Sequence, residues 1–283
     1  MKSKEIKADL HCHSYHSDGA LSPHALVLKA MEANVNLLAL TDHDTISGLA
    51  ELKEVAFEYD IHVINGVELS VRWKKHDIHI LGLNINAQHM PFADLLTKQS
   101  NSRIARAREI GRLLSLVGID DAYDKARAIA GHDNVARPHF AQLILNQGLV
   151  KTMQGAFKHY LGRGRVAYVP TEWITLEEAV VGIQGAGGEA VIAHPLKYKL
   201  TGAKLNALIS EFKHVGGMGL EVVSGGMSPS EIKKIVALCE LHEMLASTGS
   251  DFHNDSHSYI KLGRQQQLPQ TVRPIWSQWD FIS

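Results

Sequence analysis

The chain alternates short apolar runs with segments of helical periodicity. Runs of four to nine residues, rich in branched side chains, are typical of β-strands. The predicted strands cover residues 6–10, 36–40, 61–69, 77–83, 189–194, 218–223 and 244–248. Strands that alternate with helices predict βαβ units and a parallel sheet, here closed or nearly closed into a barrel.

The helices between these strands carry signals of their own. Ser22 and Pro23 are typical of an N-cap and a first helical turn, and Leu26, Ala30 and Ala33 follow at helical spacing. Further helices are predicted over residues 45–59, 175–186, 204–214 and 228–242. Each lies between two predicted strands, as a βαβ arrangement requires.

One connection is far longer than a crossover helix needs. The residues between 83 and 189 contain helical patterns at 93–117, 120–130, 137–147 and 151–161 but no convincing strand. We therefore predict a barrel domain formed by residues 1–95 and 168–283, with an inserted helical subdomain of residues 96–167.

Composition and charge bound the class of protein. The 283 residues are 45% hydrophobic and 21% charged, which is typical of a globular domain. The net charge is −1, but residues 97–165 hold 12 Lys and Arg against 5 Asp and Glu, so the predicted insertion is basic. The two cysteines form no disulfide or zinc pattern, and no segment resembles a signal peptide or membrane span. We expect a cytoplasmic protein, with no membrane association and no obligate protein partner.

Histidines and an aspartate follow the first strand. In the stretch "ADLHCHSYHSDG", His11 and His13 lie at i and i+2, so in an extended chain their side chains share a face while Cys12 faces away. Asp18 precedes Gly19, which permits a turn back toward the strand end. His16 competes for that place, and an ordinary polar loop is the alternative.

Polar residues also end the second strand, in "LALTDHDT". This edge is where barrel enzymes place their chemistry. We expect His43 to be a metal ligand, Asp42 to orient a histidine, and Asp44 only to cap the next helix.

Other predicted strands carry the same residue types at or near their ends. Glu68 follows the run 61–65, His79 lies in the fourth strand, and Pro195 is expected to hold His194 in extended geometry. "SDFH" repeats the i, i+2 spacing. The nine candidate ligands are His11, His13, Asp18, His43, Glu68, His79, His194, Asp251 and His253.

Nine ionisable side chains at one edge would be unfavourable without a metal. Imidazole and carboxylate without thiolate suit hard or borderline divalent ions. We expect two or three ions, Mn²⁺ first, with Fe²⁺ and Zn²⁺ as alternatives and Glu68 placed to bridge.

These motifs, in this order, resemble the polymerase and histidinol phosphatase (PHP) family of metal-dependent phosphoesterases. The resemblance covers residues 8–95 and about 168–258, and implies a distorted (β/α)7 barrel with a trinuclear site. It assigns His11, His13, Glu68 and Asp251 to one ion. A second would be held by Glu68, His79 and His194, and a third by Asp18, His43 and His253.

The insertion narrows the resemblance within the family. The segments "NVARPHFAQLI", "FKHYLGRGRVAYVP" and "LGRQQQLP" look like the branch that contains 3′,5′-nucleoside bisphosphate phosphatases and 5′-to-3′ exoribonucleases. This implies hydrolysis, by a metal-activated water, of the 3′-phosphate of a nucleoside 3′,5′-bisphosphate or of short 5′-phosphorylated RNA.

The basic insertion offers candidate phosphate-binding residues, because guanidinium groups pair with two phosphate oxygens. We predict that Arg137, His139, Arg163 and Arg165 bind the substrate. A solvated helix face is preferred for Arg103, Arg106, Arg108 and Arg112. Phe157, Tyr160 and Tyr168 are candidates for base stacking, with a core position as the alternative. His16 and Asp42 are left as supporting or catalytic candidates.

Three other functions share some of these features. Histidinol phosphatase is the nearest alternative, although we do not expect it to carry this basic insertion. A non-catalytic PHP module would show losses among the ligands, and an amidohydrolase would have eight strands and often a carboxylated lysine as the metal bridge. An intact ligand set with Glu68 in the bridging place favours the phosphoesterase.

Overall fold

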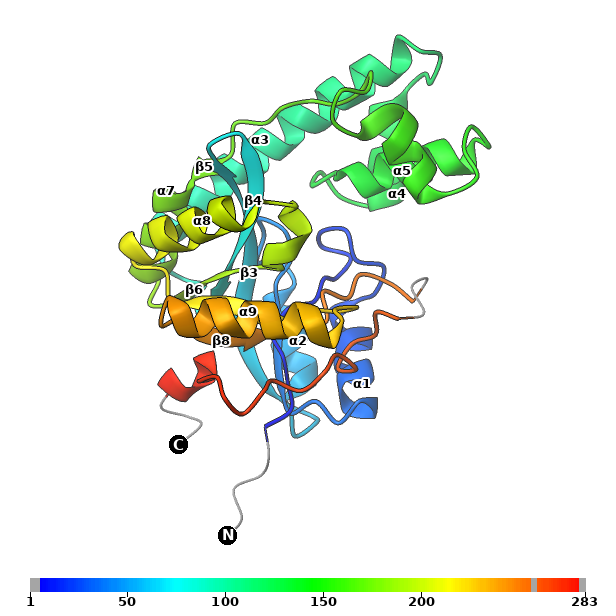
Figure 1. Cartoon of the computed structure of the whole chain (residues 1–283). Helices are drawn as coiled ribbons and strands as arrows, with labels where there is room; N and C mark the ends of the chain where they lie inside the picture. The colour runs from blue at the N-terminus through cyan, green and yellow to red at the C-terminus, as the bar shows by residue number, and fades with distance from the viewer. Residues whose placement is uncertain (1–5, 256–258, 280–283) are drawn as a thin grey trace.

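The computed structural model describes residues 6–255 and 259–279 (Figure 1). Seven strands follow one another around a barrel-shaped sheet, in the order β1-β2-β3-β4-β6-β7-β8. They are β1 (Ala8–Asp9), β2 (Leu37–Leu40), β3 (His62–Trp73), β4 (His76–Leu83), β6 (Glu189–Ile192), β7 (Gly219–Val223) and β8 (Leu245–Thr248). The sheet closes where the Leu10 N–H donates to the Thr248 carbonyl at 2.9 Å. The predicted distorted seven-stranded barrel is confirmed.

The expectation of a wholly parallel sheet was wrong. β4 is antiparallel to β3 and also to β6, whereas the other neighbours in the barrel order are parallel. Only Lys74 and Lys75 separate β3 from β4, and a connection this short permits a hairpin but no crossover. The reversal has a functional consequence, because it brings the start of β4 to the edge where the parallel strands end.

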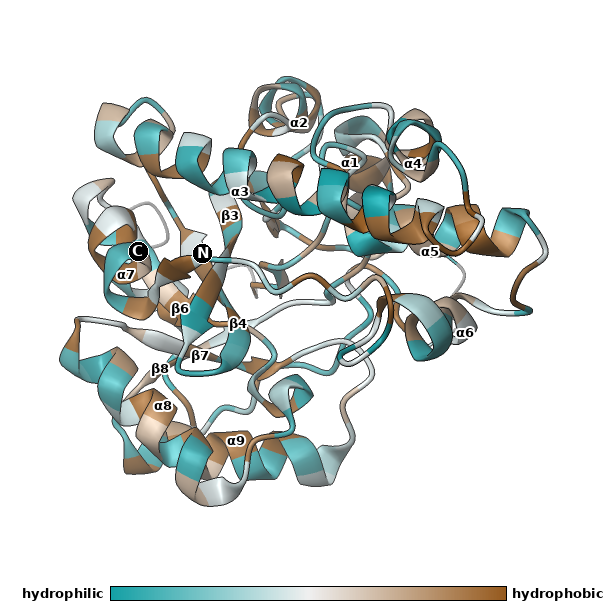
Figure 2. Cartoon of the chain, turned by 90° about the horizontal axis from the view of Figure 1, so that it is seen from above, coloured by the Kyte–Doolittle hydropathy of each residue, from teal (hydrophilic) through white to brown (hydrophobic). Residues whose placement is uncertain are grey.

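Helices that connect the barrel strands pack around the outside of the barrel (Figure 2). They are α1 (Pro23–Glu32), α2 (Leu49–Ala56), α7 (Leu176–Gly185), α8 (Gly202–His214) and α9 (Pro229–Leu241). Ser22 caps α1 as predicted, since its hydroxyl accepts a hydrogen bond from the Ala25 N–H at 3.1 Å. α2 is shorter than the predicted 45–59 because residues 45–48 form a turn before it.

The long connection contains more than helices. A two-residue strand, β5 (Ile174–Thr175), pairs with β3 outside the barrel order, and no strand was predicted at these residues. Two short 3-10 turns lie outside this connection, at Pro195–Tyr198 and Ile275–Gln278.

The inserted helices have a hydrophobic core of their own. They are α3 (Met90–Ser115), α4 (Ala122–Ala130), α5 (Arg137–Asn146), α6 (Met153–Ala156) and a π-helical turn at Phe157–Leu161. Phe92 and Leu96, early in α3, pack in the barrel core, whereas Ile110 and Leu114 pack with Phe140 of α5. One long helix therefore carries the insertion out from the barrel (Figure 1). None of the helices in the described part of the chain is long and apolar enough to span a bilayer.

Candidate metal centre

The nine candidate ligands, far apart in sequence, meet at one edge of the barrel. They form overlapping groups in which the ligand atoms lie within 4.8 Å of one another. The groups are His13, Asp18, His43 and His253; His11, Glu68 and His194; His11, His13 and Asp251; and His43, Glu68 and His79. No residue of the predicted set lies outside this cluster.

Glu68 lies at the centre of the cluster, and its two carboxylate oxygens face different histidines. Oε1 is 2.8 Å from His79 Nδ1 and 3.0 Å from His194 Nε2. Oε2 is 3.3 Å from the Nε2 atoms of both His11 and His13, and 3.0 Å from His43 Nδ1. A fully buried carboxylate with two such faces has the geometry of a group that can bridge two ions.

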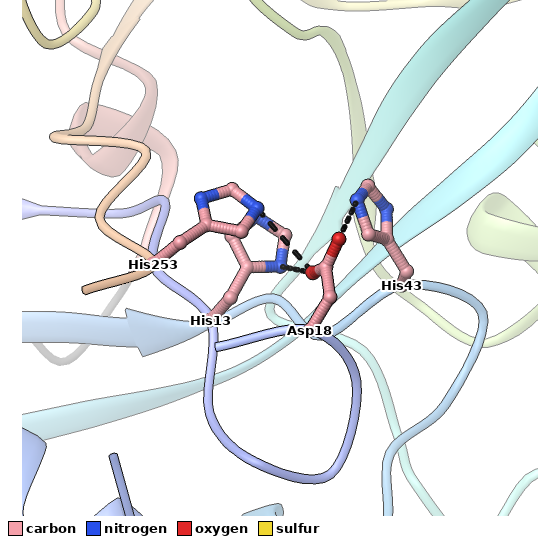
Figure 3. A group of neighbouring side chains, drawn as sticks. All are labelled: His13, Asp18, His43 and His253. Carbon is pink, nitrogen blue, oxygen red and sulfur yellow. Dashed lines mark ion pairs between the residues drawn. The ribbon is translucent and has the colours of Figure 1, made fainter. Parts of the chain in front are cut away.

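Asp18 joins a second set of imidazoles (Figure 3). Its Oδ1 is 3.3 Å from His253 Nε2 and 3.9 Å from His13 Nδ1, and its Oδ2 is 3.8 Å from His43 Nε2. Gly19 makes the necessary turn possible, because a Cβ at that position would lie 2.2 Å from the His13 carbonyl oxygen. The turn brings Asp18 back over the strand end.

The backbone places two of the candidate ligands, His79 and His194, in ways that were not predicted from the sequence. His79 lies near the start of β4, and the antiparallel direction of β4 places it beside the ends of the parallel strands. The expected extended geometry of His194 was wrong: its φ is +27°, and Asp251 likewise has φ +54°. Positive φ at non-glycine residues is strained and is found at functional sites. The Glu221 carboxylate fixes this conformation at His194 by accepting its N–H at 2.6 Å.

The carboxylates of the cluster are ionised despite their burial. Burial by itself raises a carboxyl pKa, but His79 and His11 hold the pKa of Glu68 well below its usual range. His43 and His253 act in the same way on the pKa of Asp18. Lys197 and His11 do so for Asp251. The edge therefore concentrates negative charge among neutral or cationic rings.

Two charged residues of the site were missed by the sequence analysis. Glu221, fully buried in β7, accepts a hydrogen bond from His11 Nδ1 at 2.9 Å, which leaves His11 Nε2 pointing into the cluster. Lys197, in the 3-10 turn after β6, forms an ion pair with Asp251 Oδ2. A glutamate inside the apolar run "MGLEVV" was the available signal for Glu221. No comparable signal pointed to Lys197, because its contact with Asp251 depends on how two segments that are distant in the sequence pack together.

The roles expected for the aspartates beside His43 were wrong. Asp42 accepts hydrogen bonds from the N–H and hydroxyl of Ser14 and from the Ser17 hydroxyl, at 2.6–2.8 Å. It therefore fixes the loop that carries Asp18, and within residues 6–255 and 259–279 it forms no hydrogen bond with a histidine. Asp44 does not cap α2, which has no side-chain cap. It accepts from Ser70 N–H at 2.7 Å and from Arg103 Nε at 2.6 Å.

The solvated face expected for the arginines of α3 was wrong for two of the four. Arg103 is 5% exposed and is bound to Asp44, and Arg106 is half-buried. Both guanidinium groups lie over the ring of Trp173. Arg108 and Arg112 are exposed as expected, and Arg112 pairs with Glu109.

The other candidates lie at different distances from the cluster. His16 is outside it, with Nε2 3.5 Å from Glu51. Arg137 and His139, in the first turn of α5, are half-buried, and burial lowers the pKa of both. The negative charge of Asp18 offsets part of this lowering at each group. Arg163 and Arg165 are exposed.

The aromatic candidates also differ from one another in their surroundings. Phe157 and Tyr160 pack against the core of the inserted helices, which is the alternative set out above. Tyr168 is half-buried and influences the pKa of both Arg106 and Arg137.

The donor set fits divalent metal ions. Several buried polar atoms of the cluster have no hydrogen-bond partner among the described residues, although other ligand atoms lie close by. They are His13 Nδ1, Asp18 Oδ1, His43 Nδ1, Glu68 Oε2 and His194 Nδ1. Buried polar atoms are rarely left unpaired, and imidazole and carboxylate donors converging without thiolate are ligands of Mn²⁺, Fe²⁺ and Zn²⁺.

The barrel and the donor set together define a metal-dependent hydrolase. The sequence profile of the PHP domain family matches residues 9–184, and the chain belongs to that family. A 5′-3′ exoribonuclease of Haemophilus influenzae is 42% identical over 96% of this chain and 99% of its own length. A 3′,5′-nucleoside bisphosphate phosphatase of Chromobacterium violaceum is 41% identical, over 95% and 94% respectively.

A solved structure from the same bacterium supports the fold. It superimposes with a TM-score of 0.92 at 39% identity, covers 98% of this chain and 97% of its own, and is described as an amidohydrolase with bound sulfate and no metal. That name is the alternative considered above. The barrel order here has seven strands, and Glu68 rather than a lysine lies at the centre of the donors.

Proposed function

We propose that the protein is a phosphoesterase that removes the 3′-phosphate of nucleoside 3′,5′-bisphosphates and releases nucleotides from the 5′ end of short 5′-phosphorylated RNA. The observation that carries the proposal is the nine-donor cluster around Glu68. The relatives named above, which match nearly the whole chain, support both activities.

The two activities are one chemical reaction. In both substrates water attacks the 3′-phosphorus of the nucleotide that carries the 5′-phosphate, and the bond that breaks joins this phosphorus to the 3′-oxygen. The 3′-oxygen leaves with the nucleotide, and the phosphoryl group becomes inorganic phosphate or the new 5′-phosphate of the shortened RNA. A nucleotide with a 5′-phosphate is the common part of both substrates. A site that anchors this phosphate and holds the 3′-phosphoryl group over the nine donors can therefore accept both.

We assign the ligands to three ions as the family resemblance implies. One set is His11, His13, Glu68 and Asp251, a second is Glu68, His79 and His194, and a third is Asp18, His43 and His253. The proposed ions are divalent, two or three in number, with Mn²⁺ favoured over Fe²⁺ and Zn²⁺. When bound, they activate water and neutralise charge on the phosphoryl oxygens.

Residues of the inserted helices are proposed to hold the non-reacting 5′-phosphate. Arg137 offers a guanidinium fork at the start of α5. His139 Nδ1 accepts the Ala136 N–H at 2.9 Å, and burial lowers the His139 pKa to about 4, so the neutral ring carries its proton on Nε2. That N–H can donate to a phosphate oxygen. Arg163 and Arg165 stay predicted contacts for longer substrates, because both are exposed on the same insertion.

The proposal is tested with purified protein loaded with Mn²⁺. We expect phosphate release from adenosine 3′,5′-bisphosphate and mononucleotide release from a 5′-phosphorylated oligoribonucleotide, with histidinol phosphate as the competing substrate. Glu68→Gln, which removes the bridging charge, should abolish both releases. Metal-loaded protein that acts on neither nucleotide, or that prefers histidinol phosphate, would contradict the assignment.

We also propose a cytoplasmic location. Both cysteines, Cys12 and Cys239, are free and buried, which suits a reducing compartment. Cys12 faces away from the cluster as expected, and its thiol donates to the Ala39 carbonyl.

A further inference from the structure

The hydrogen-bond ladder between β4 and β6 is interrupted beside the metal centre. The register of these antiparallel strands pairs Ile80 with Ile192, which places His79 opposite Ala193. Opposite residues that share one ladder hydrogen bond normally exchange a second one. The Ala193 N–H donates to the His79 carbonyl at 3.1 Å, but the His79 N–H donates to a side chain instead.

The hydroxyl of Tyr198 takes the place of the second ladder bond. The His79 N–H donates to this hydroxyl at 2.9 Å, and the hydroxyl donates to the Ala193 carbonyl at 2.8 Å. The His79 carbonyl lies further from the hydroxyl, at 3.3 Å, so the single hydroxyl proton is best directed at Ala193. One side-chain oxygen therefore separates two backbone groups that would otherwise bond directly.

The two backbone positions that Tyr198 separates carry candidate metal ligands. His79 is itself a ligand candidate, and Ala193 is followed directly by His194. Glu68 Oε1 lies 2.8 Å from His79 Nδ1 and 3.0 Å from His194 Nε2. The Tyr198 and His194 rings are 5.4 Å apart in an edge-to-face arrangement. Tyr198 thus acts on one histidine through its hydroxyl and on the other through its ring as well.

The turn after β6 holds Tyr198 in this place. Pro195 begins the 3-10 turn Pro195–Tyr198, in which Lys197 pairs with Asp251, a ligand of a different proposed set. The turn is therefore tied to the metal centre at two adjacent residues. This attachment limits the freedom of the Tyr198 hydroxyl to leave the ladder.

We propose that Tyr198 is a positioning residue that sets the separation of His79 and His194, and that the ion assigned to Glu68, His79 and His194 requires this separation. The inference rests on the proposed function and its metal assignment, and adds a residue that supports two ligands without being one. Without the hydroxyl, the strands can close onto a direct His79–Ala193 bond or leave two backbone groups unpaired. Either change moves or loosens the two histidines.

The first test counts ions. The wild type, Tyr198→Phe and Tyr59→Phe are equilibrated with buffered Mn²⁺, and the metal bound per chain is measured by elemental analysis. Tyr59, half-buried against the barrel core and outside the ligand groups, is the matched control. We expect Tyr198→Phe to need about 10- to 100-fold more free Mn²⁺ to fill one of its ions, and Tyr59→Phe to match the wild type. Equal affinities in the wild type and Tyr198→Phe, or a loss of all ions together, would overturn the inference.

Turnover separates this inference from the proposed activity. Initial rates on adenosine 3′,5′-bisphosphate are measured for the same three proteins as free Mn²⁺ is raised. We expect the rate of Tyr198→Phe to follow its ion count, low where the one ion is missing and rising as added Mn²⁺ fills its site. Selective loss of that ion in proteins that do not hydrolyse the bisphosphate would leave the positioning role standing and refute the proposed activity.

A further measurement does not depend on the variant. In a crystal structure of the Mn²⁺-loaded wild type, the Tyr198 hydroxyl should lie between the His79 N–H and the Ala193 carbonyl. A direct hydrogen bond between these two backbone groups in the loaded protein would refute the inference, even if Tyr198→Phe failed to fold.

Discussion

The buried ion pair between Arg103 and Asp44 is the sharpest target for a stability measurement. Arg103 lies on α3 and is 5% exposed, and Asp44 lies in the loop after β2 and is 2% exposed. Their Nε and Oδ2 atoms are 2.6 Å apart, and Gln99 Nε2 and Ser70 N–H donate to the other carboxylate oxygen at 2.8 and 2.7 Å. The pair thus ties the inserted helices to the loop that carries His43.

We predict that Arg103→Met destabilises the protein by about 3–5 kcal/mol, because it leaves the Asp44 carboxylate buried with two neutral donors. For a chain of this size that corresponds to a fall in Tm of about 6–15 °C. The measurement is urea and thermal unfolding followed by circular dichroism. Arg112→Met, which breaks an exposed pair on the same helix, should leave the unfolding midpoints close to those of the wild type, because water and salt screen an exposed pair.

A double-mutant cycle separates the charge from the packing. Asp44 has φ +52°, a conformation that asparagine tolerates, so Asp44→Asn removes the charge with little backbone strain. In the Asp44→Asn background, Arg103→Met should cost at least about 1 kcal/mol less than it does alone, since no buried charge is left unpaired. The reasoning fails if Arg103→Met lies within about 1 kcal/mol of the wild type, or if its cost is the same in both backgrounds.

Three further predictions concern the metal centre. Glu221→Gln should weaken metal affinity by about 10- to 100-fold, because it removes the charge that orients His11, and metal titration with the wild type in parallel measures this. His16→Ala should keep full metal content and stay within about threefold of wild-type turnover, because His16 lies outside the ligand groups; a loss of turnover at full metal content would instead give it a direct role. Chelation should lower Tm and added Mn²⁺ should restore it, since ions that bind only the folded cluster stabilise it by mass action, and a Tm indifferent to metal would contradict the assignment.

The candidate ligands could be found from sequence because each requirement is local. A metal ligand must be a particular residue type at or near the end of a strand, and apolar runs reveal where strands end. His11 and His13 are recognisable by their i, i+2 spacing, and Asp18 by the glycine that permits its turn. The alternation of strands and helices was likewise sufficient to predict a barrel.

The direction of β4 was not recoverable from that alternation. The hydrophobic pattern locates a strand but carries no information on its orientation. His79 was therefore predicted at the correct edge of the barrel, but the antiparallel direction of β4, which puts it there, was not predicted. The two-residue separation between β3 and β4 became evident only with the true end of β3 at Trp73, four residues beyond the predicted end.

Residue types, the approximate positions of the barrel strands and the basic character of the insertion were thus determined by the sequence alone. The partners of each charge were decided by tertiary structure: Arg103 meets Asp44, Glu221 meets His11, and Arg106 meets no acidic group in an ion pair among the described residues. The physical reason is that the free energy of a buried charge depends on what the fold brings within a few ångströms of it, and these contacts join segments more than fifty residues apart.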